Sequence, residues 1–258
     1  MGQLLKSAAH DSNVLKLLRH YAVRTAQEQF GLGVYIRGLI EVARGAEVTT
    51  EREAHEFAEK LAEGQPFMTT SCCPSYMEMA RKHAPDLQKN ISSTYSPMVY
   101  TADIAREKYP NAKLVFVGPC IAKRKEARRD DLEGKVHFVL TLEEIHAMFK
   151  GMNIELGNEH IHAVDCTSCR AAHGFAENGG VTGAVKQFVG DSLDFTSLQI
   201  AGLNKKSVAL LKAYGKTGKA PAQFIEVMAC EGGCISGPSV HTAYGDGKKT
   251  FDAELNKR

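Results

Sequence analysis

Residues 224–234 read FIEVMACEGGC, an apolar strand pattern that runs directly into two cysteines. The segment 224–228 predicts a short strand, and Cys230 follows it. A second predicted strand, over 113–117, runs in the same way into Cys120. Because open α/β sheets place their sites at the carboxyl ends of strands, we expect Cys120 and Cys230 at such ends.

Helix and strand patterns alternate along the rest of the chain, which favours an α/β fold. Capping-box patterns at Thr50 with Glu53, and at Thr141 with Glu144, indicate two helix starts. The expected helices cover about 13–29, 51–63, 97–109, 142–150, 180–189 and 207–214, and a third strand covers about 136–140. We expect one domain over residues 1–258, with two lobes of mostly parallel sheet flanked by helices, about 1–110 and 111–258, and a site in the cleft between them.

The composition is that of an ordinary globular protein. Of the 258 residues, 43% are hydrophobic and 24% are charged, and the net charge is +2, which gives no electrostatic reason to bind nucleic acid or membranes. No apolar run reaches membrane-spanning length and no secretory segment is visible, so we expect a cytoplasmic protein with an unmodified N-terminus. The seven cysteines are irregularly spaced and odd in number, which favours metal binding over disulfides.

Five of the seven cysteines lie in three short motifs that are typical of iron-sulfur ligands. TSCCP spans residues 70–74, GPCIAK spans 118–123, and the third motif lies within 224–234. Four thiolates hold one cubane cluster, which leaves one cysteine over. Consecutive side chains of an extended segment point in opposite directions, so Cys72 and Cys73 are not expected to bind the same cluster.

In the third motif Cys230 and Cys234 are four residues apart, a spacing that puts two sulfurs on one face of a helical turn. Gly232 and Gly233 lack the side chains that would keep an inorganic cofactor away. Thiolates select zinc, copper(I) or iron-sulfur clusters. Structural zinc sites usually use paired short-range ligands, so ligands this far apart in sequence favour a cluster, with a structural zinc protein as a weaker alternative.

In their order, spacing and intervening residues, the three motifs resemble the signatures of the catalytic domain of [FeFe] hydrogenases, over about residues 50–240. The resemblance implies that the cleft holds an H-cluster. This cofactor joins a [4Fe-4S] cluster to a diiron subcluster with carbon monoxide, cyanide and an azadithiolate bridge. The implied ligands are Cys73, Cys120, Cys230 and Cys234, with Cys234 bridging to the diiron subcluster. Cys72 is the implied proton donor to the bridging amine.

The same resemblance implies roles for residues around the diiron subcluster. Lys123 is the implied hydrogen-bond partner of a cyanide, and Glu126 is expected to orient Lys123. The implied walls of the diiron pocket are Met228, Pro97 and Phe175. Phe175 belongs to the segment GFAENGGV, residues 174–181, which is similar to a glycine-rich pocket segment of the family.

A proton relay is the second implied feature. Heterolytic splitting of hydrogen needs a Lewis-acidic metal, a base beside it and a route to solvent. A thiol of near-neutral pKa would suit the first step, at Cys72. The resemblance places Glu56, Ser92 and Glu53 in succession between Cys72 and the surface. The alternative for the two glutamates is the solvated face of a helix.

The chain departs from the family pattern around the diiron pocket. Tyr76 stands for a tryptophan, Gly118 for a methionine and Met98 for a glutamine, and residues 235–238, ISGP, replace a triple glycine with glutamine. No cysteine precedes Cys72, so we expect no ferredoxin-like cluster modules. The implied partners are therefore an external electron carrier, a ferredoxin or similar protein, and the maturases of the H-cluster.

Two hypotheses follow for the activity. The first is an iron-only hydrogenase that interconverts protons plus electrons and H2, with evolution as the favoured direction. The second is a noncatalytic relative, an iron-sulfur assembly factor or a hydrogen sensor, that binds only the [4Fe-4S] cluster. The presence of Cys72, Lys123 and Met228 favours catalysis, because a protein holding only a cubane has no physical need for a proton donor or a cyanide partner.

Two further sequence features, a basic run and a CxxC pair, each have more than one possible role. A basic run could attract an acidic ferredoxin or simply be helix surface; it comprises Lys123, Arg124, Lys125, Arg128 and Arg129. A CxxC pair could be two reduced thiols, half of a metal site, a redox pair or part of an intersubunit cluster. It comprises Cys166 and Cys169, with His160, His162 and His173 nearby in sequence.

Overall fold

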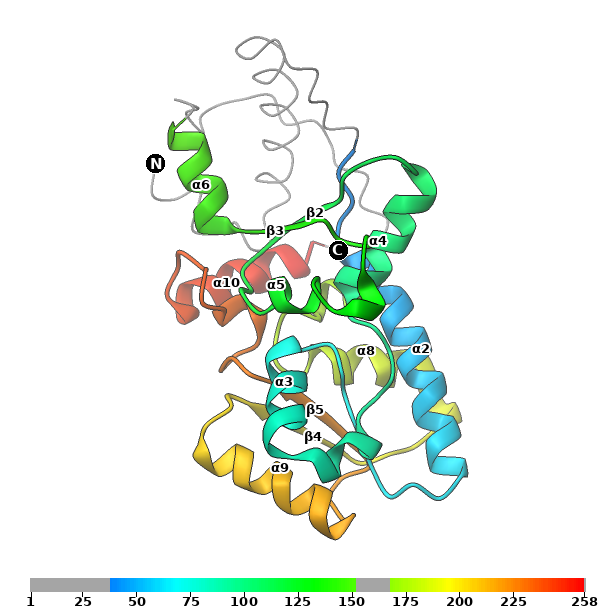
Figure 1. Ribbon diagram of the computed structural model, residues 1–258. Helices are drawn as coiled ribbons and strands as arrows, with labels where there is room; N and C mark the ends of the chain where they lie inside the picture. Colours follow the sequence, from blue (N-terminus) through cyan, green and yellow to red (C-terminus); the bar gives the residue numbers. More distant parts are fainter. Residues whose placement is uncertain (1–37, 152–167, 258) are drawn as a thin grey trace.

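The computed structural model describes residues 38–151 and 168–257, and Figure 1 shows the arrangement of their helices and strands. The expected helix at 13–29 lies outside the described residues, and so do Cys166, His160 and His162. No helix in the described part of the chain is long and apolar enough to cross a membrane.

The larger sheet is built around β5 (Phe224–Met228), which pairs in parallel with β1 (Met68–Thr69) and with β4 (Ser197–Ala201). All of β5 is buried. A parallel strand that is covered on both faces needs a nearly continuous run of apolar residues, and β5 has such a run. The strand predicted over 224–228 is confirmed with the same bounds. β1 and β4 were not predicted from the sequence. β1 has only two residues, and β4 is only partly buried and therefore lacks a continuous apolar run.

A second sheet consists of β2 (Val115–Gly118) and β3 (Phe138–Thr141), which are also parallel. They confirm the strands predicted over 113–117 and 136–140, shifted toward the C-terminus. The expected division into lobes near residue 110 does not coincide with the division between sheets, because β1 pairs with the distant β5.

Helices flank both sheets (Figure 1). The helices of the described ranges are α2 (Ala43–Ala62), α3 (Pro74–His83), α4 (Pro97–Lys108), α5 (Lys123–Glu126), α6 (Leu142–Gly151), α7 (Arg170–Gly174), α8 (Gly180–Val189), α9 (Lys205–Thr217) and α10 (Tyr244–Leu255). Short 3-10 helices include η2 (Pro85–Asn90) and η5 (Cys234–Ser236). The helices expected at 97–109, 142–150 and 180–189 agree closely with α4, α6 and α8.

One of the two predicted capping boxes is present. At the start of α6 the backbone N–H of Thr141 donates to Glu144 over 2.8 Å, and the N–H of Glu144 donates to the Thr141 hydroxyl over 3.2 Å. The box at Thr50 is wrong, because α2 begins earlier, at Ala43. The Thr50 hydroxyl instead donates to the carbonyl of Ala46 inside the helix, over 2.8 Å.

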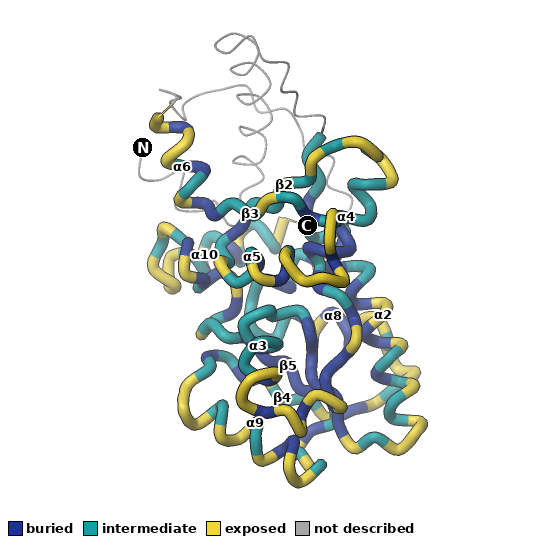
Figure 2. The backbone as a smooth tube through the Cα atoms, in the orientation of Figure 1, coloured by how far each residue is buried: buried dark blue, intermediate teal, exposed yellow. Residues whose placement is uncertain are grey.

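Two core layers cover the faces of the larger sheet, and the tube in Figure 2 is dark blue along β5 between them. The first layer joins β5 to α2, α7 and α8, and includes Phe57, Val181 and Phe224. The second joins β5 to α3, η2 and α9, and includes Leu211 and Ile225. Alternate residues of β5 enter opposite layers, as the period of a strand requires.

Candidate functional site

The four expected cluster ligands lie at the ends of strands and the starts of helices. Cys120 comes just after β2 and Cys230 just after β5, so both are at carboxyl ends of strands, as predicted. Cys73 is the N-cap residue of α3, and Cys234 begins η5. The larger and the smaller sheet therefore both contribute cysteines to this region.

The charges of these thiols act on one another. Burial, followed by the neighbouring Cys73 and Cys120, raises the pKa of Cys230 to about 11. Burial and the same two thiols raise the pKa of Cys234 to about 12. Charges influence each other in this way only over short distances, so the four sulfurs converge although they are far apart in sequence.

The converging thiols are still partly accessible. Cys234 is exposed to solvent, and Cys73, Cys120 and Cys230 are half-buried. Burial is nevertheless the main cause of the raised pKa of Cys234. Protein atoms therefore surround this thiol although part of the residue reaches solvent. The four residues thus keep some access from outside while their thiols lie together.

Gly232 and Gly233 turn the chain between Cys230 and Cys234 with φ of 81° and 86°, a region that favours glycine. The helical turn expected between the two cysteines is therefore wrong. A Cβ at Gly232 would lie 2.2 Å from the ring of Tyr244, and a Cβ at Gly233 would lie 2.7 Å from neighbouring backbone. These glycines make room for protein atoms, and not for an approaching cofactor as the sequence suggests.

Cys72 and Cys73 belong to opposite faces of the larger sheet, as their adjacency predicts. Cys72 packs against the first core layer and Cys73 against the second. Burial, followed by the charges of Glu53 and Cys73, raises the pKa of Cys72 well above its ordinary value. The expectation of a near-neutral thiol is therefore wrong, and Cys72 keeps its proton at pH 7.

Apolar side chains surround Cys72. Met228, at the end of β5, and Phe175, just after α7, are buried in the first core layer that Cys72 also contacts. Pro97 is half-buried at the first position of α4. The neighbouring Ser96 is 1% exposed, and its hydroxyl has no hydrogen-bond partner among residues 38–151 and 168–257. An unpartnered buried hydroxyl is rare in proteins and is free to bond with a ligand.

Lys123 and Glu126 form a buried ion pair beside the cysteines. The Lys123 ammonium donates to Glu126 Oε2 over 2.7 Å and to the backbone carbonyl of Cys72 over 3.3 Å. Burial acts to lower the pKa of Lys123, but the charge and hydrogen bond of Glu126, together with the nearby Cys120 and Cys72, outweigh it and the pKa is raised. The expected contact of Glu126 with Lys123 is present, and it holds a permanent positive charge next to Cys72.

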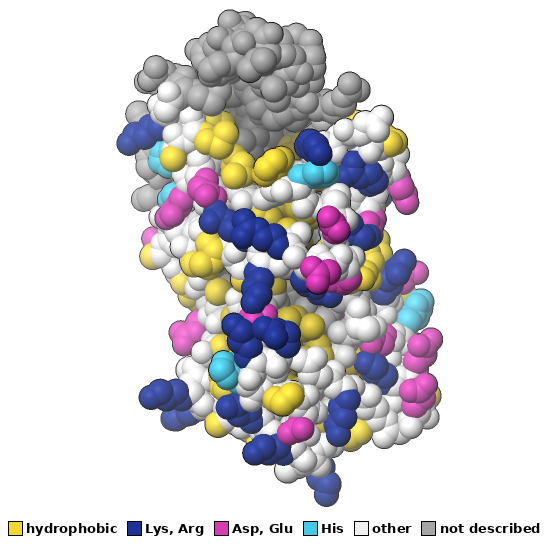
Figure 3. Space-filling model, viewed as in Figure 1, with side chains coloured by type: hydrophobic (Ala, Val, Ile, Leu, Met, Phe, Trp, Pro, Cys, Tyr) yellow, Lys and Arg dark blue, Asp and Glu magenta, His cyan; other side chains and the backbone are white. Residues whose placement is uncertain are grey.

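A surface cluster of charges lies on the helices that follow two of the cysteines. Glu78 on α3 is bonded by Arg81 over 2.7 Å, by Lys82 over 3.0 Å and by Lys125 of α5 over 2.6 Å. Figure 3 shows Lys and Arg side chains gathered on this face of the molecule. The basic run predicted from Lys123 onward is only partly surface, because Lys123 itself turns inward.

Glu53 is the most unusual residue of the region. It is fully buried on α2, and within the described part of the chain neither carboxylate oxygen has a well-formed hydrogen bond, although the Ser71 N–H and the Ser92 hydroxyl lie close enough to act on its pKa. Burial, followed by the charge of Glu56, raises the pKa of Glu53 to about 8. Glu53 is therefore a neutral carboxylic acid at pH 7. The solvated-face alternative does not hold for this residue.

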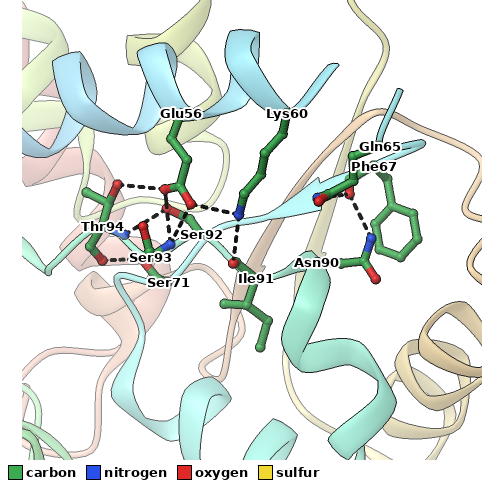
Figure 4. A network of polar contacts seen from close by, with 10 residues as sticks. All are labelled: Glu56, Lys60, Gln65, Phe67, Ser71, Asn90, Ile91, Ser92, Ser93 and Thr94. Carbon is green, nitrogen blue, oxygen red and sulfur yellow. Dashed lines mark hydrogen bonds and ion pairs between the residues drawn. The ribbon is translucent and has the colours of Figure 1, made fainter. Parts of the chain in front are cut away.

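Glu56, one turn further along α2, differs from Glu53 in both its hydrogen bonding and its protonation state. It accepts hydrogen bonds from the Ser92 hydroxyl over 2.6 Å and from the Ser93 N–H over 2.8 Å, and it pairs with Lys60 over 2.7 Å (Figure 4). Burial acts to raise its pKa, but these partners lower the pKa of Glu56 to about 2. Glu56 is thus ionised and half-buried.

The order of the relay residues differs from the one implied by the family resemblance. Glu53, not Glu56, is the carboxyl close enough to Cys72 for its ionisation to raise the pKa of the thiol. Glu56 lies at the outer end, where Lys60 is partly exposed. The order from inside to outside is therefore Cys72, Glu53, Ser92 and Glu56, because the inward face of α2 carries Glu53 into the core while Glu56 stays at its edge.

One buried polar residue was missed by the sequence reasoning. Glu226 is fully buried in β5, and it accepts hydrogen bonds from Gly179 and Thr182 at the start of α8. The signal was available, because a glutamate in the middle of a buried apolar strand needs partners. The exposed Cys169 gains no clear role: its N–H donates to Glu47 over 2.8 Å.

The donor set suits an iron-sulfur cluster. Within the described ranges, no group of three or more His, Cys, Asp or Glu side chains is spaced to hold a single metal ion. Ligands of one zinc ion lie about 2.3 Å from it, whereas each thiolate of a cubane binds a different iron and the four lie farther apart. The converging and partly accessible thiols, with the buried Glu53 carboxyl close to Cys72, fit a bound group at this place.

Comparisons with known proteins agree with this chemistry. The family described as iron only hydrogenase large subunit, C-terminal domain, matches residues 32–238. Iron hydrogenase 1 of Clostridium pasteurianum is 28% identical, over 83% of this chain and 44% of the relative. A cytosolic Fe-S cluster assembly factor of Danio rerio is 27% identical, over 74% of this chain and 58% of the relative. The chain spans about half the length of the curated relatives it matches.

Solved structures show the same fold. A variant of an [FeFe]-hydrogenase from Chlamydomonas reinhardtii matches with a TM-score of 0.70 and 20% identity, covering 96% of this chain and 81% of the other. The similarity extends to the mixed α/β architecture with parallel sheets flanked by helices, which the sequence predicts.

Proposed function

The chain belongs to the iron-only hydrogenase family, and we propose that it is a hydrogenase that interconverts protons plus electrons and H2, mainly toward evolution of H2. One observation carries this proposal, the fully buried carboxyl of Glu53, which has no well-formed hydrogen bond among the described residues and lies close enough to Cys72 for its ionisation to raise the pKa of that thiol. A buried polar group without a partner costs roughly 1–3 kcal/mol of stability. A protein that only stores or transfers a cluster gains nothing from that cost.

The proposed cofactor is the H-cluster, with the [4Fe-4S] part held by Cys73, Cys120, Cys230 and Cys234. When bound, its diiron part supplies a metal that binds hydrogen and an amine that exchanges protons. The apolar side chains of Met228 and Phe175 exclude water on the side of Cys72. Lys123, held by Glu126, provides a positive charge and N–H donors that suit an anionic ligand such as cyanide.

The relay residues have protonation states that suit stepwise proton transfer. Cys72 holds a proton on its sulfur, and Glu53 holds one that can replace it. The hydroxyl of Ser92 bonds to Glu56, which is ionised and reaches the surface beside Lys60. Two carboxyls one turn apart with pKa values pushed in opposite directions form an acid and a base, an arrangement typical of catalytic sites.

The proposed electron donor is an acidic carrier protein of the ferredoxin type. The surface cluster of Glu78, Arg81, Lys82 and Lys125 has three cations for one carboxylate. It lies on α3 and α5, which follow the proposed ligands Cys73 and Cys120 directly. A carrier bound there would be close to the [4Fe-4S] cluster. H-cluster maturases, and a reducing cytoplasm in which the thiols stay free, complete this proposal.

A second candidate function is that of an iron-sulfur assembly factor, with only the [4Fe-4S] cluster bound. The relatives include such factors. The departure from the family pattern after Cys234 also favours it: Gly237 packs so tightly that a Cβ there would lie 2.8 Å from the carbonyl oxygen of Pro119. This packing differs from an open glycine-rich segment, and it borders the proposed ligand Cys120.

Loading experiments separate the two functions. Purified protein is reconstituted with iron and sulfide, then exposed to a synthetic diiron complex with carbonyl, cyanide and azadithiolate ligands. A hydrogenase takes up the complex, shows its infrared bands and evolves H2 from a reduced carrier. We expect Cys72→Ala to retain the bands and to lose at least about 100-fold in rate, the contribution typical of a positioned acid.

The matched control is Cys169→Ala, which removes an exposed thiol away from the proposed ligands. It should evolve H2 at the rate of the unaltered protein. A spectrum of the [4Fe-4S] cluster without uptake of the diiron complex would support the assembly factor instead. Uptake with equal rates for the two cysteine variants would remove Cys72 from the proposed mechanism.

A further inference from the structure

Glu226 is a second fully buried carboxyl near the relay, and the function proposed above gives it no role. It lies on the face of β5 that α8 covers. Its Oε1 accepts the N–H of Gly179, and its Oε2 accepts both the N–H and the hydroxyl of Thr182, each over 2.8 Å. Gly179 is the N-cap residue of α8, so Glu226 ties the start of this helix to the strand.

The hydrogen-bond donors around Glu226 indicate that its carboxyl group is ionised. Two N–H groups and one hydroxyl point at its oxygens, and a carboxylate that only accepts hydrogen bonds satisfies all three. The start of a helix also carries partial positive charge from its peptide dipoles. Burial, with a smaller effect from the charge of Glu177, raises the pKa of Glu226 above its ordinary value, and the bonds from Thr182 and Gly179 act against this rise. The three donors assign Glu226 as the ionised member of the two buried carboxyls, because a protonated carboxyl could not accept all three bonds as well.

Glu53 is the other member: among the described residues it has no well-formed hydrogen bond, and the Ser71 N–H and the Ser92 hydroxyl that approach it only partly offset the rise of its pKa. The charged groups that act on it most strongly are Glu56, from its own helix, and Glu226, from β5 across the first core layer. Glu226 also acts on Cys72. Since no cation faces Glu53 among its strongest neighbours, a negative charge on Glu226 makes ionisation of Glu53 more difficult.

We propose that Glu226 is a positioning residue for proton transfer: its fixed buried charge adds to burial and to Glu56 in keeping Glu53 protonated, so that the relay rests as a proton donor beside Cys72. The α8 N-terminus stabilises this charge, and the glutamate in turn fixes α8 against the sheet. The purpose of the arrangement rests on the proposed hydrogenase function. The interaction between the two carboxyls does not, because it needs neither cluster nor turnover.

The test is an infrared titration of the full chain without clusters, which follows the carbonyl stretch of protonated carboxyl groups. The band of Glu53 is identified by its loss in Glu53→Gln. In Glu226→Gln a negative charge is removed, so ionisation of Glu53 becomes easier. We expect the pKa of Glu53 to fall by roughly one unit, the size of a nearby-charge effect.

Two controls separate the charge from its surroundings. Thr182→Val removes one hydrogen bond but keeps the charge and both backbone donors, so the titration of Glu53 should stay nearly the same. Glu107→Gln makes the same chemical change at an exposed position of α4 and should have no effect. An unchanged pKa of Glu53 in Glu226→Gln, or an equal shift in Thr182→Val, would overturn the proposal.

The unaltered protein provides a second measurement that needs no Glu226 variant to fold. At neutral pH the buried carboxyl band should vanish completely in Glu53→Gln, because Glu226 is ionised. A remaining buried band would show a protonated Glu226 and would also overturn the proposal. Failure of the diiron loading would leave these outcomes unaffected, so the two proposals fail separately.

Discussion

Two lysines of α5 form ion pairs of similar length in different surroundings. Lys123 is 2.7 Å from Glu126, and the two side chains are 11% and 6% exposed. Lys125 is 2.6 Å from Glu78, and its side chain is 61% exposed. Distance alone would make the pairs equivalent. In water, however, each charge is already solvated and the pair adds little, whereas in the interior each partner replaces the water that the other has lost.

The comparison extends from these pairs to whole regions. In the region around Cys72 the ionisable side chains of Glu53, Glu226 and Lys123 are buried. Each has lost the water that would stabilise its charged form. The four charged groups of the surface cluster, Glu78, Arg81, Lys82 and Lys125, stay in contact with water and have no such cost. Proteins accept buried ionisable groups mainly where chemistry uses them, so the contrast marks the buried region as the site of reaction and the surface cluster as a place of association.

The largest expected effect comes from breaking the buried pair. Lys123→Met leaves the carboxylate of Glu126 buried without its partner and should lower the free energy of unfolding by about 3 kcal/mol, as removal of one partner of a buried pair does. Denaturant unfolding of the full chain measures this loss. The double variant Lys123→Met with Glu126→Leu should regain most of it, because it leaves no unpaired charge. A double variant as unstable as the single one would contradict the importance of the pair.

The next effect is a pH dependence that separates Glu53 from Glu56. The pKa of Glu53 is raised from 4.5 to about 8, so the protonated form stabilises the fold below pH 4.5 and this contribution is lost as pH rises toward 8. Glu53→Gln should remove a decline of up to about 1 kcal/mol per pH unit, which amounts to roughly 2.5 kcal/mol between pH 4.5 and pH 7. The measurement is the free energy of unfolding at several pH values.

Glu56 provides the matched comparison with the opposite sign. Its pKa is lowered from 4.5 to about 2, so its contribution is present above pH 4.5 and is lost as pH falls toward 2. Glu56→Gln should therefore flatten only the acid side of the stability profile. If both variants changed the same side, the assignment of one neutral and one ionised carboxyl would fail.

The smallest effect on stability is expected at the surface cluster. Glu78→Gln should leave the midpoint of denaturant unfolding unchanged, because exposed ion pairs contribute little. Lys125→Glu should instead slow electron transfer from an acidic carrier, and the difference should shrink at high salt, where charges are screened. Stopped-flow reduction of the [4Fe-4S] cluster at two salt concentrations measures this. If the rate of reduction changed neither with the Lys125→Glu substitution nor with the salt concentration, the surface cluster around Glu78 would be excluded as the docking place of the carrier.

Several features could be predicted from local sequence. The strand over 224–228 and the capping box at Thr141 depend on neighbouring residues, and both are present. Cys120 and Cys230 follow strands directly, so their position at carboxyl ends was predictable too. The start of α2 was not, because Thr50 imitates an N-cap while the residues before it continue the helix.

Burial explains why the relay order could not be predicted. Glu53 and Glu56 have the same chemistry and lie within one turn of one helix, so sequence spacing cannot tell which faces the core. The first core layer decides this by covering Glu53 and leaving Glu56 at its edge. The requirement for glycine at 232 and 233 could not be predicted either. It arises because Tyr244 and backbone distant in sequence pack against these two positions and leave no room for a Cβ.

The sequence by itself determined the kind of chemistry: five cysteines in three motifs, and the strands that deliver two of them, because ligand type and strand pattern are local properties. Only the tertiary structure decided the protonation states, since the pKa of a carboxyl depends on which groups surround it. Glu53, Glu56 and Glu226 are the same amino acid, and packing alone makes one of them neutral, one ionised at the surface and one ionised at the start of a helix.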